Sequence, residues 1–148
     1  GLLLQAKGDL AAAELLHRES LEAKRETLAN RHPSTLTSIN NLGTLLYAKG
    51  DLAAAGPLFR EALEAQRETL GNRHPSTLAT ISNLGMLLMD KGDLAAAETL
   101  LREALEGVRE TLGNRHPSTL SSMDNLSQLL EEKGDFAAAK QREMDRWT

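Results

Sequence analysis

The sequence of 148 residues has no cysteine and very few aromatic residues, with one Trp, one Tyr and two Phe. The absence of cysteine excludes disulfides, cysteine-rich zinc sites and thiol catalysis. With so few aromatics, leucine and alanine must form the core, and this mixture favours close-packed helices over strands. No apolar run approaches the roughly 18 residues that span a bilayer, and no signal peptide is visible. We therefore expect a helical, cytoplasmic protein.

Basic residues are also in short supply. The net charge is −4, with 17 Lys and Arg against 21 Asp and Glu, and the acidic excess is concentrated in residues 85–126. No basic stripe exists that could follow a nucleic acid backbone or an anionic membrane. These observations argue against nucleic acid and membrane as partners and leave proteins or peptides.

The sequence does contain a repeat. The heptapeptide NRHPSTL recurs every 42 residues, at residues 30–36, 72–78 and 114–120. Ungapped copies span residues 1–42, 43–84 and 85–126, and a partial fourth copy spans residues 127–148; 28 of the 42 positions are identical in all three full copies. A fixed period of this length predicts one array of stacked structural units. Because Gly1 falls inside a repeat, we expect the chain to be a fragment of a longer protein.

One repeat reads as two helices joined by a tight turn. Pro33 suits the first turn of a helix, and residues 34–49 carry apolar side chains at spacings of three and four, which mark one buried helical face. Gly50 suits the end of that helix, and Asp51 is a candidate N-cap for the next. The second helix should end before Gly71. The pattern predicts a nearly all-α chain of about seven to eight helices, counting partial ones.

Residues that could carry catalysis or bind metal lack the required arrangement. His32, His74 and His116 recur once per repeat, and stacking would separate them by roughly 10 Å, whereas the ligands of one metal lie at about 2 Å from it. We expect them in loops or at helix N-caps. His17 and Ser20 have no identifiable acid partner, and no phosphate loop is present. We predict no enzyme activity, no cofactor and no metal.

The repeat resembles a known family. Its motif consists of Leu42, Gly43, Leu46, Gly50, Leu52, Ala55, Phe59 and Ala62. The order and spacing of these residues resemble the tetratricopeptide repeat, although that unit usually has about 34 residues. The combination of NxxHPxTL, a following Asn-Leu and KGD is similar to the 42-residue repeats of kinesin light chains. This resemblance implies an all-α, right-handed superhelical solenoid of antiparallel helix pairs that mediates protein–protein interaction. That family carries more Tyr in these helices, and here Tyr47 is the one exception.

The resemblance also implies a binding face. In such arrays the first helix of each unit lines a concave groove, and the candidate peptide-binding residues are Asn40, Asn41, Thr44, Tyr47, Asn83, Met86, Met89, Asn125 and Gln128. Apart from Asn41, Asn83 and Asn125, these columns vary between copies, through selection for a ligand or through neutral drift. Asparagine both donates and accepts hydrogen bonds, and in the family it holds peptide backbones at this place. The alternative is a hydrogen bond from each asparagine to a neighbouring helix or loop.

Two functions of different kinds therefore remain. The first is a scaffold that holds an extended peptide in the groove, and the second is a structural spacer or self-assembling element with no peptide ligand. Solenoids need polar outer faces on their terminal repeats, which Arg142 and Glu143 partly supply at the C-terminal end. The N-terminal end has no such provision. We expect weak self-association through the N-terminal repeat end.

Overall fold

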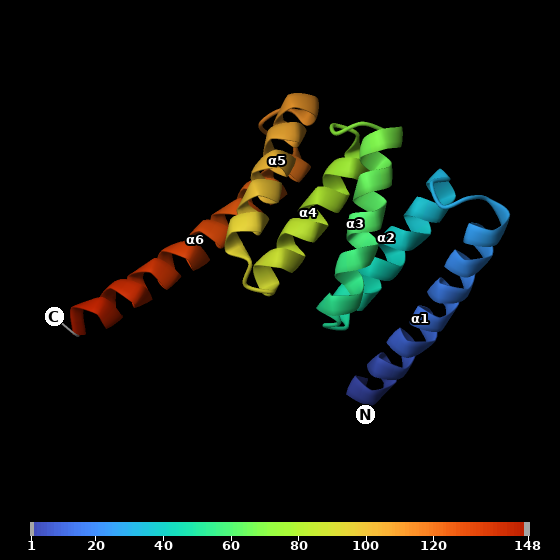
Figure 1. Cartoon of the computed structure of the whole chain (residues 1–148), viewed down its shortest axis with the longest axis horizontal. Coiled ribbons are helices and arrows are strands. Elements are labelled where there is room, and N and C mark those ends of the chain that lie inside the picture. The colour runs from blue at the N-terminus through green and yellow to red at the C-terminus, as the bar shows by residue number, and fades with distance from the viewer. Residues whose placement is uncertain (1, 147–148) are drawn as a thin grey trace. The chain divides into compact units, whose positions relative to one another are not determined.

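The structure is a computed structural model that describes the backbone of residues 2–146 and, within that range, all side chains except those of residues 2–7, 136, 138–140, 142, 143 and 146. The described residues form six helices and no strand (Figure 1). The helices are α1 (Leu2–Thr27), α2 (Pro33–Ala48), α3 (Leu52–Thr69), α4 (Pro75–Asp90), α5 (Leu94–Leu112) and α6 (Pro117–Arg146). The prediction of a nearly all-α chain is confirmed, and the predicted count of seven to eight helices is too high.

The count is lower because two expected helix breaks do not occur, at the first and last copies of the Lys-Gly-Asp motif. Gly50 and Gly92 adopt φ values of 86° and 87° and separate successive helices. Gly8 and Gly134 occupy the same motif but lie inside α1 and α6. A glycine within a helix costs only about 1 kcal/mol. The turn is therefore favoured only where it lets two complete helices pack against each other. The terminal copies contain only part of one helix of the pair, and their motif stays helical.

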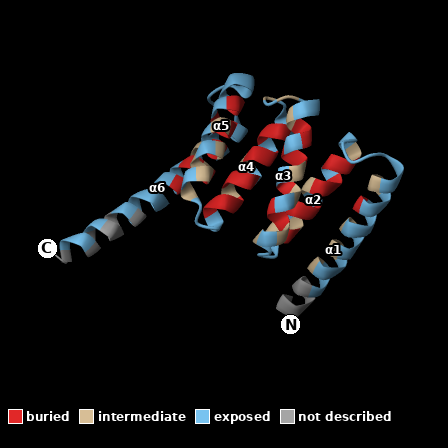
Figure 2. Cartoon of the chain, viewed as in Figure 1, coloured by how far each residue is buried: buried red, intermediate tan, exposed pale blue. Residues whose placement is uncertain are grey.

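The chain divides into two compact units, residues 1–84 and 85–148, and the division coincides with the boundary between the second and third sequence copies. In the first unit, α2 packs against both α1 and α3. In the second unit, α5 packs against α6. Burial is concentrated on the faces where helices meet (Figure 2). The most deeply buried apolar side chains of α2 and α3 are those of Ile39, Leu42, Leu46, Ala55, Phe59 and Ala62.

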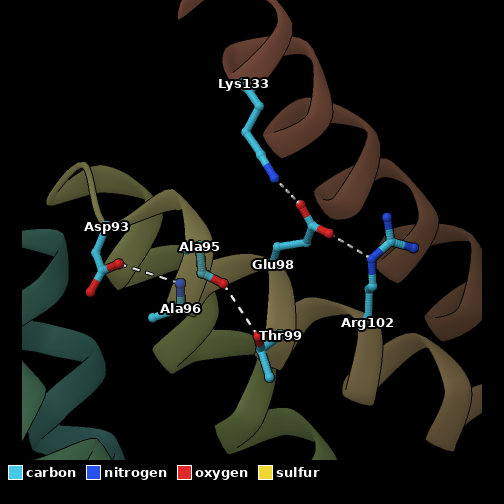
Figure 3. Close-up of polar contacts among 7 residues, drawn as sticks. All are labelled: Asp93, Ala95, Ala96, Glu98, Thr99, Arg102 and Lys133. Carbon is cyan, nitrogen blue, oxygen red and sulfur yellow. Dashed lines mark hydrogen bonds and ion pairs between the residues drawn. The ribbon is translucent and has the colours of Figure 1, made fainter. Parts of the chain in front are cut away.

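Local signals set the interior helix boundaries. The Oδ1 atom of Asp51 accepts a hydrogen bond from the N–H of Ala54 at 3.2 Å, so it caps the first turn of α3 as the sequence predicts. Asp93 does the same for α5 through Ala96 at 3.3 Å (Figure 3). These caps satisfy backbone donors that have no partner within the helix. The interior helix pairs are therefore defined by the sequence immediately around each turn.

Ion pairs connect α1 to both of the next two helices. Nζ of Lys49, at the C-terminal end of α2, lies 2.6 Å from Oε1 of Glu14 on α1. The guanidinium of Arg25 on α1 contacts both carboxylate oxygens of Glu61 on α3, at 2.7 and 3.0 Å. The paired arrangement of planar groups makes this one of the stronger kinds of ion pair. The contact raises the pKa of Arg25, chiefly through the hydrogen bond to Glu61.

Candidate functional site

The first helix of each pair exposes one register-matched strip of side chains. On α2 the strip runs along residues spaced four, three and four apart, which share one helical face. We call these rows the asparagine strips: Thr37, Asn41, Thr44 and Ala48 on α2; Ala79, Asn83, Met86 and Asp90 on α4; Ser121, Asn125, Gln128 and Glu132 on α6. All twelve residues are exposed except Met86 and Asn125, which are half-buried. Three helices thus carry the same exposed row, with asparagine at the same place in each.

The three asparagines have no intramolecular partner among the residues that the structure describes. No hydrogen bond in that part of the chain involves the side chain of Asn41, Asn83 or Asn125. The hydrogen bond to a neighbouring helix or loop that would give them a structural role is therefore not seen there. Each amide keeps a donor and an acceptor. Such a group can pair with the backbone of another chain.

Asn40 differs from its neighbour Asn41. Its Nδ2 atom donates to Oγ1 of Thr80, at 3.0 Å, and so links α2 to α4 within the first unit. The Thr80 hydroxyl in turn donates to the carbonyl oxygen of Ser76 at 3.1 Å. The Oδ1 atom of Asn40 is buried without a hydrogen-bond partner. The structure thus places Asn40 in a contact between helices, whereas Asn41 faces solvent.

The remaining candidates lie in different surroundings. Thr44 and Gln128 are exposed, and Met86 and Tyr47 are half-buried, with the side chain of Tyr47 already engaged in a contact. Met89 is only 3% exposed, so it has little surface to offer a ligand. The exposed strips therefore include six of the nine predicted binding residues, and Asn40, Tyr47 and Met89 lie outside them.

A hollow of about 710 Å³ lies beside the end of the strips in the second unit. It is lined by Met89, Asp90, Gly92, Leu94, Glu132, Lys133 and Ala137. Three of these side chains are apolar and two are carboxylates, a combination that suits a side chain with an aliphatic stem and a cationic end. Sequence reasoning did not find this hollow. Ala137 contributes to this hollow because α6 continues straight through Gly134. The Lys-Gly-Asp motif does not reveal that continuation.

One lining residue of this hollow, Lys133, belongs to a branched ion pair. Nζ of Lys133 donates to Oε1 of Glu98 at 2.5 Å, and Nε of Arg102 donates to Oε2 at 2.9 Å (Figure 3). The hydrogen bonds from Lys133 and then Arg102 hold the pKa of the Glu98 carboxyl below its usual value. The ammonium group of Lys133 is thus held by Glu98. The lining of the hollow therefore includes two carboxylates, of Asp90 and Glu132, and one ammonium group that is already paired.

The histidine row has a structural role. Nδ1 of His32 accepts a hydrogen bond from the N–H of Ser34 at 3.1 Å, which makes His32 the N-cap of α2. His74 and His116 make the same contact, at 3.1 and 3.0 Å. Within the described part of the chain, no three His, Asp or Glu side chains are grouped so that they could hold a metal ion. Nor is any described helix both long enough and apolar enough to cross a membrane.

Comparisons with known proteins identify the repeat. The family described as tetratricopeptide repeat matches residues 1–68, 39–88 and 76–145, so its matches extend over nearly the whole chain. A search of the curated proteins finds no match. Among solved structures, a kinesin light chain-related protein of Podosopora anserina with nearly identical TPR-like repeats is 29% identical, with a TM-score of 0.82, and a second structure of that protein is 30% identical with the same score.

Each of these two structures covers 91% of this chain, whereas the chain spans only 64% of their own length. BtubC (BKLC) from P. vanneervenii covers 90% of this chain at 23% identity with a TM-score of 0.78, and it supports the fold alone. The predicted all-α solenoid of antiparallel helix pairs is confirmed by these matches. The chain belongs to the tetratricopeptide repeat family, and its repeats are of the kinesin light chain-like class.

Proposed function

We propose that this protein is a non-enzymatic, cytoplasmic scaffold that holds an extended peptide on its asparagine strips. The observation that supports the proposal is the exposure of Asn41 and Asn83, whose amides have no hydrogen-bond partner among the described residues. An extended peptide carries unpaired N–H and C=O groups, which an asparagine amide matches with its own acceptor and donor. Tetratricopeptide repeats are a scaffold class, and recognition on such a scaffold depends on the side chains of the site.

The side chains around the asparagines indicate the class of peptide. In the second unit the strips carry Asp90 and Glu132, and both carboxylates line the hollow together with apolar Leu94 and Ala137. A lysine or arginine side chain of the peptide would place its methylene groups against the apolar wall and its charge near the carboxylates. We therefore propose a peptide that carries a basic residue beside the segment held by Asn125.

Fluorescence polarisation against a library of labelled extended peptides tests this proposal. The decisive pair of variants is Asn41→Ala and Asn40→Ala, which remove the same amide from adjacent positions of α2. Loss of a hydrogen bond to a peptide should weaken binding by roughly fivefold to tenfold in Asn41→Ala, with an unchanged melting temperature. Asn40→Ala removes the bond to Thr80 and should lower the melting temperature. The proposal is wrong if Asn41→Ala and Asn83→Ala leave every peptide affinity unchanged.

A second candidate function is a structural element that joins copies of itself. The observation that favours it is an apolar pair on α1: Leu15 is 70% exposed and Leu16 is 67% exposed. Exposed apolar surface of this kind promotes association. Analytical ultracentrifugation over a concentration series tests this candidate, because a self-assembling chain must sediment faster as its concentration rises.

A further inference from the structure

The hollow of the second unit contains a cation of its own. Its charged lining residues are Asp90, Glu132 and Lys133. Lys133 follows Glu132 directly in the chain, and its ammonium group ends a flexible stem of four carbons. A peptide lysine or arginine that enters the hollow therefore meets two carboxylates and one ammonium group. Where that ammonium group is held bears directly on how strongly the carboxylates attract the peptide residue.

Glu98 on α5 holds the ammonium group of Lys133. Nζ of Lys133 lies 2.5 Å from Oε1 of Glu98, and Nε of Arg102 lies 2.9 Å from Oε2, so each carboxylate oxygen faces a cation (Figure 3). These hydrogen bonds keep the pKa of the Glu98 carboxyl below its usual value, and Glu98 is therefore ionised at neutral pH. Among the described residues, Glu98 does not itself line the hollow. Any influence that it has on the hollow passes through Lys133.

The same ion pair occurs in the first unit. There Nζ of Lys49 lies 2.6 Å from Oε1 of Glu14, and Nε of Arg18 lies 3.0 Å from Oε2. Lys49 is the C-cap residue of α2, whereas Lys133 lies inside α6. The ion pair therefore forms whether or not the helix continues beyond the lysine. The residue before Lys49 is Ala48, which has no charge, so the first unit has the ion pair without the neighbouring carboxylate.

We propose that Glu98 is a positioning residue of the peptide site, which holds Lys133 away from the two carboxylates of the hollow so that they can receive a basic residue of the peptide. Glu98 acts through Lys133 and does not contact the peptide. Without Glu98, the ammonium group of Lys133 is free to pair with Asp90 and Glu132 and to compete with the peptide. This inference rests on the proposed peptide-binding function and adds a residue that determines its selectivity for basic side chains.

Fluorescence polarisation with two probe peptides tests this role. The first probe is the tightest-binding library peptide that carries one lysine, and the second has norleucine in place of that lysine, which keeps the methylene stem and removes the ammonium group. The ratio of their affinities measures the attraction of the hollow for the charge. Glu98→Gln should reduce this ratio by roughly twofold to fivefold, as expected for one partly exposed charge pair. A variant that only damaged the fold would weaken both peptides alike and leave the ratio unchanged.

Lys133→Met separates release of the ammonium group from a general effect of charge. In the wild type Glu98 already holds Lys133, so Lys133→Met alone should change the ratio by less than about twofold. In the Lys133→Met background, Glu98→Gln should lose its effect, because no ammonium group is left to release. If Glu98→Gln lowers the ratio equally in both backgrounds, Glu98 acts on the peptide through its own charge and the proposal is overturned.

Two further variants separate failure of this inference from failure of the peptide site. Glu14→Gln is the matched control, because it breaks the equivalent ion pair of the first unit and should leave the ratio unchanged. Glu132 is exposed and makes no polar contact among the described residues, so Glu132→Gln should lower the ratio by removing a charge alone.

The outcomes then divide clearly. If Glu132→Gln lowers the ratio and Glu98→Gln does not, the peptide site stands and the role of Glu98 is wrong. If Glu132→Gln leaves the ratio unchanged, the site for a basic residue and the role of Glu98 are both wrong. A library in which no lysine-containing peptide binds would also overturn both.

Discussion

The ring of Phe59 on α3 lies directly against Gly43 on α2. A Cβ placed on Gly43 would come within 2.9 Å of ring atom Cε1, and the ring itself is only 1% exposed. The next repeat has the same relationship between Gly85 and Leu101, where a Cβ would come within 2.7 Å of Cδ2. Glycine at this column therefore sets how closely the two helices of a pair approach.

Gly43→Ala should destabilise the protein more than Gly85→Ala. Alanine gains about 1 kcal/mol in helix propensity, but overpacking a rigid, buried ring costs about 1–3 kcal/mol, so we expect a net loss for Gly43→Ala. At Gly85 the nearest atoms are Cδ2 and Cγ of Leu101, at 2.7 and 2.9 Å, and a leucine side chain can adjust at lower cost than a rigid ring. Urea unfolding monitored by circular dichroism measures both variants. An equal or larger loss for Gly85→Ala would contradict this account of the contact.

Ala29→Gly should stabilise the loop between α1 and α2. Ala29 has a φ of 141°, and its equivalents in the later repeats are Gly71 and Gly113, with φ values of 90° and 89°. A side chain in this region of φ is strained by about 1–3 kcal/mol, and glycine relieves the strain while adding less than that to the entropy of the unfolded chain. The denaturation midpoint should rise. Ala23→Gly, in the exposed face of α1, is the control and should lower it.

The ion pairs of Glu14 and Glu98 should make stability depend on pH. Hydrogen bonds from Lys49 and then Arg18 hold the pKa of Glu14 below the ordinary value of 4.5, as Lys133 and Arg102 do for Glu98. A carboxyl whose pKa is lower in the folded than in the unfolded chain stabilises the fold above its ordinary pKa and loses that contribution as pH falls through the folded value. Stability should therefore decline below about pH 4.5.

Glutamine variants isolate this contribution. Glu14→Gln combined with Glu98→Gln should lower the melting temperature at neutral pH and reduce its decline in acid, because the titrating groups are gone. Glu22→Gln, an exposed glutamate outside these ion pairs, should leave the acid profile close to that of the wild type. A double variant whose melting temperature declines in acid as steeply as that of the wild type would show that other carboxylates dominate the profile.

The interior helices could be read from the sequence because their boundaries depend on nearby residues. Pro33 begins α2, Gly50 ends it, and Asp51 caps α3, each within one turn of the boundary that it sets. The terminal helices could not be read in this way. Gly134 has the same neighbours as Gly50, and its different conformation depends on whether a complete second helix follows and packs back.

The candidate site was predictable to a similar degree. A helical repeat of 3.6 residues predicts that Asn41 and Asn83 lie on the same exposed face of α2 and α4, and both are exposed. Sequence alone could not show that Asn40 is held by a neighbouring helix, because this contact depends on Thr80, which comes from the next repeat and reaches Asn40 only in the folded chain. The acidic hollow likewise depends on contacts between segments that are far apart in the sequence. Whether the asparagines bind a peptide stays a prediction.

Gly50→Ala and Gly134→Ala should have opposite effects, although both change the glycine of a Lys-Gly-Asp motif. Gly50 has a φ of 86°, a conformation that costs alanine about 1–2 kcal/mol. Gly134 lies within α6, and a Cβ there would meet nothing within 4 Å, so alanine should gain up to about 1 kcal/mol in helix propensity.

Urea unfolding should therefore place the midpoint of Gly50→Ala below that of the wild type. The effect of Gly134→Ala is best measured by amide hydrogen exchange, which should slow in the residues around position 134. Faster exchange in Gly134→Ala would mean that the last Lys-Gly-Asp motif forms a turn in solution, as its sequence alone suggests. Residues 135–146 would then be able to fold back onto the apolar face of α6.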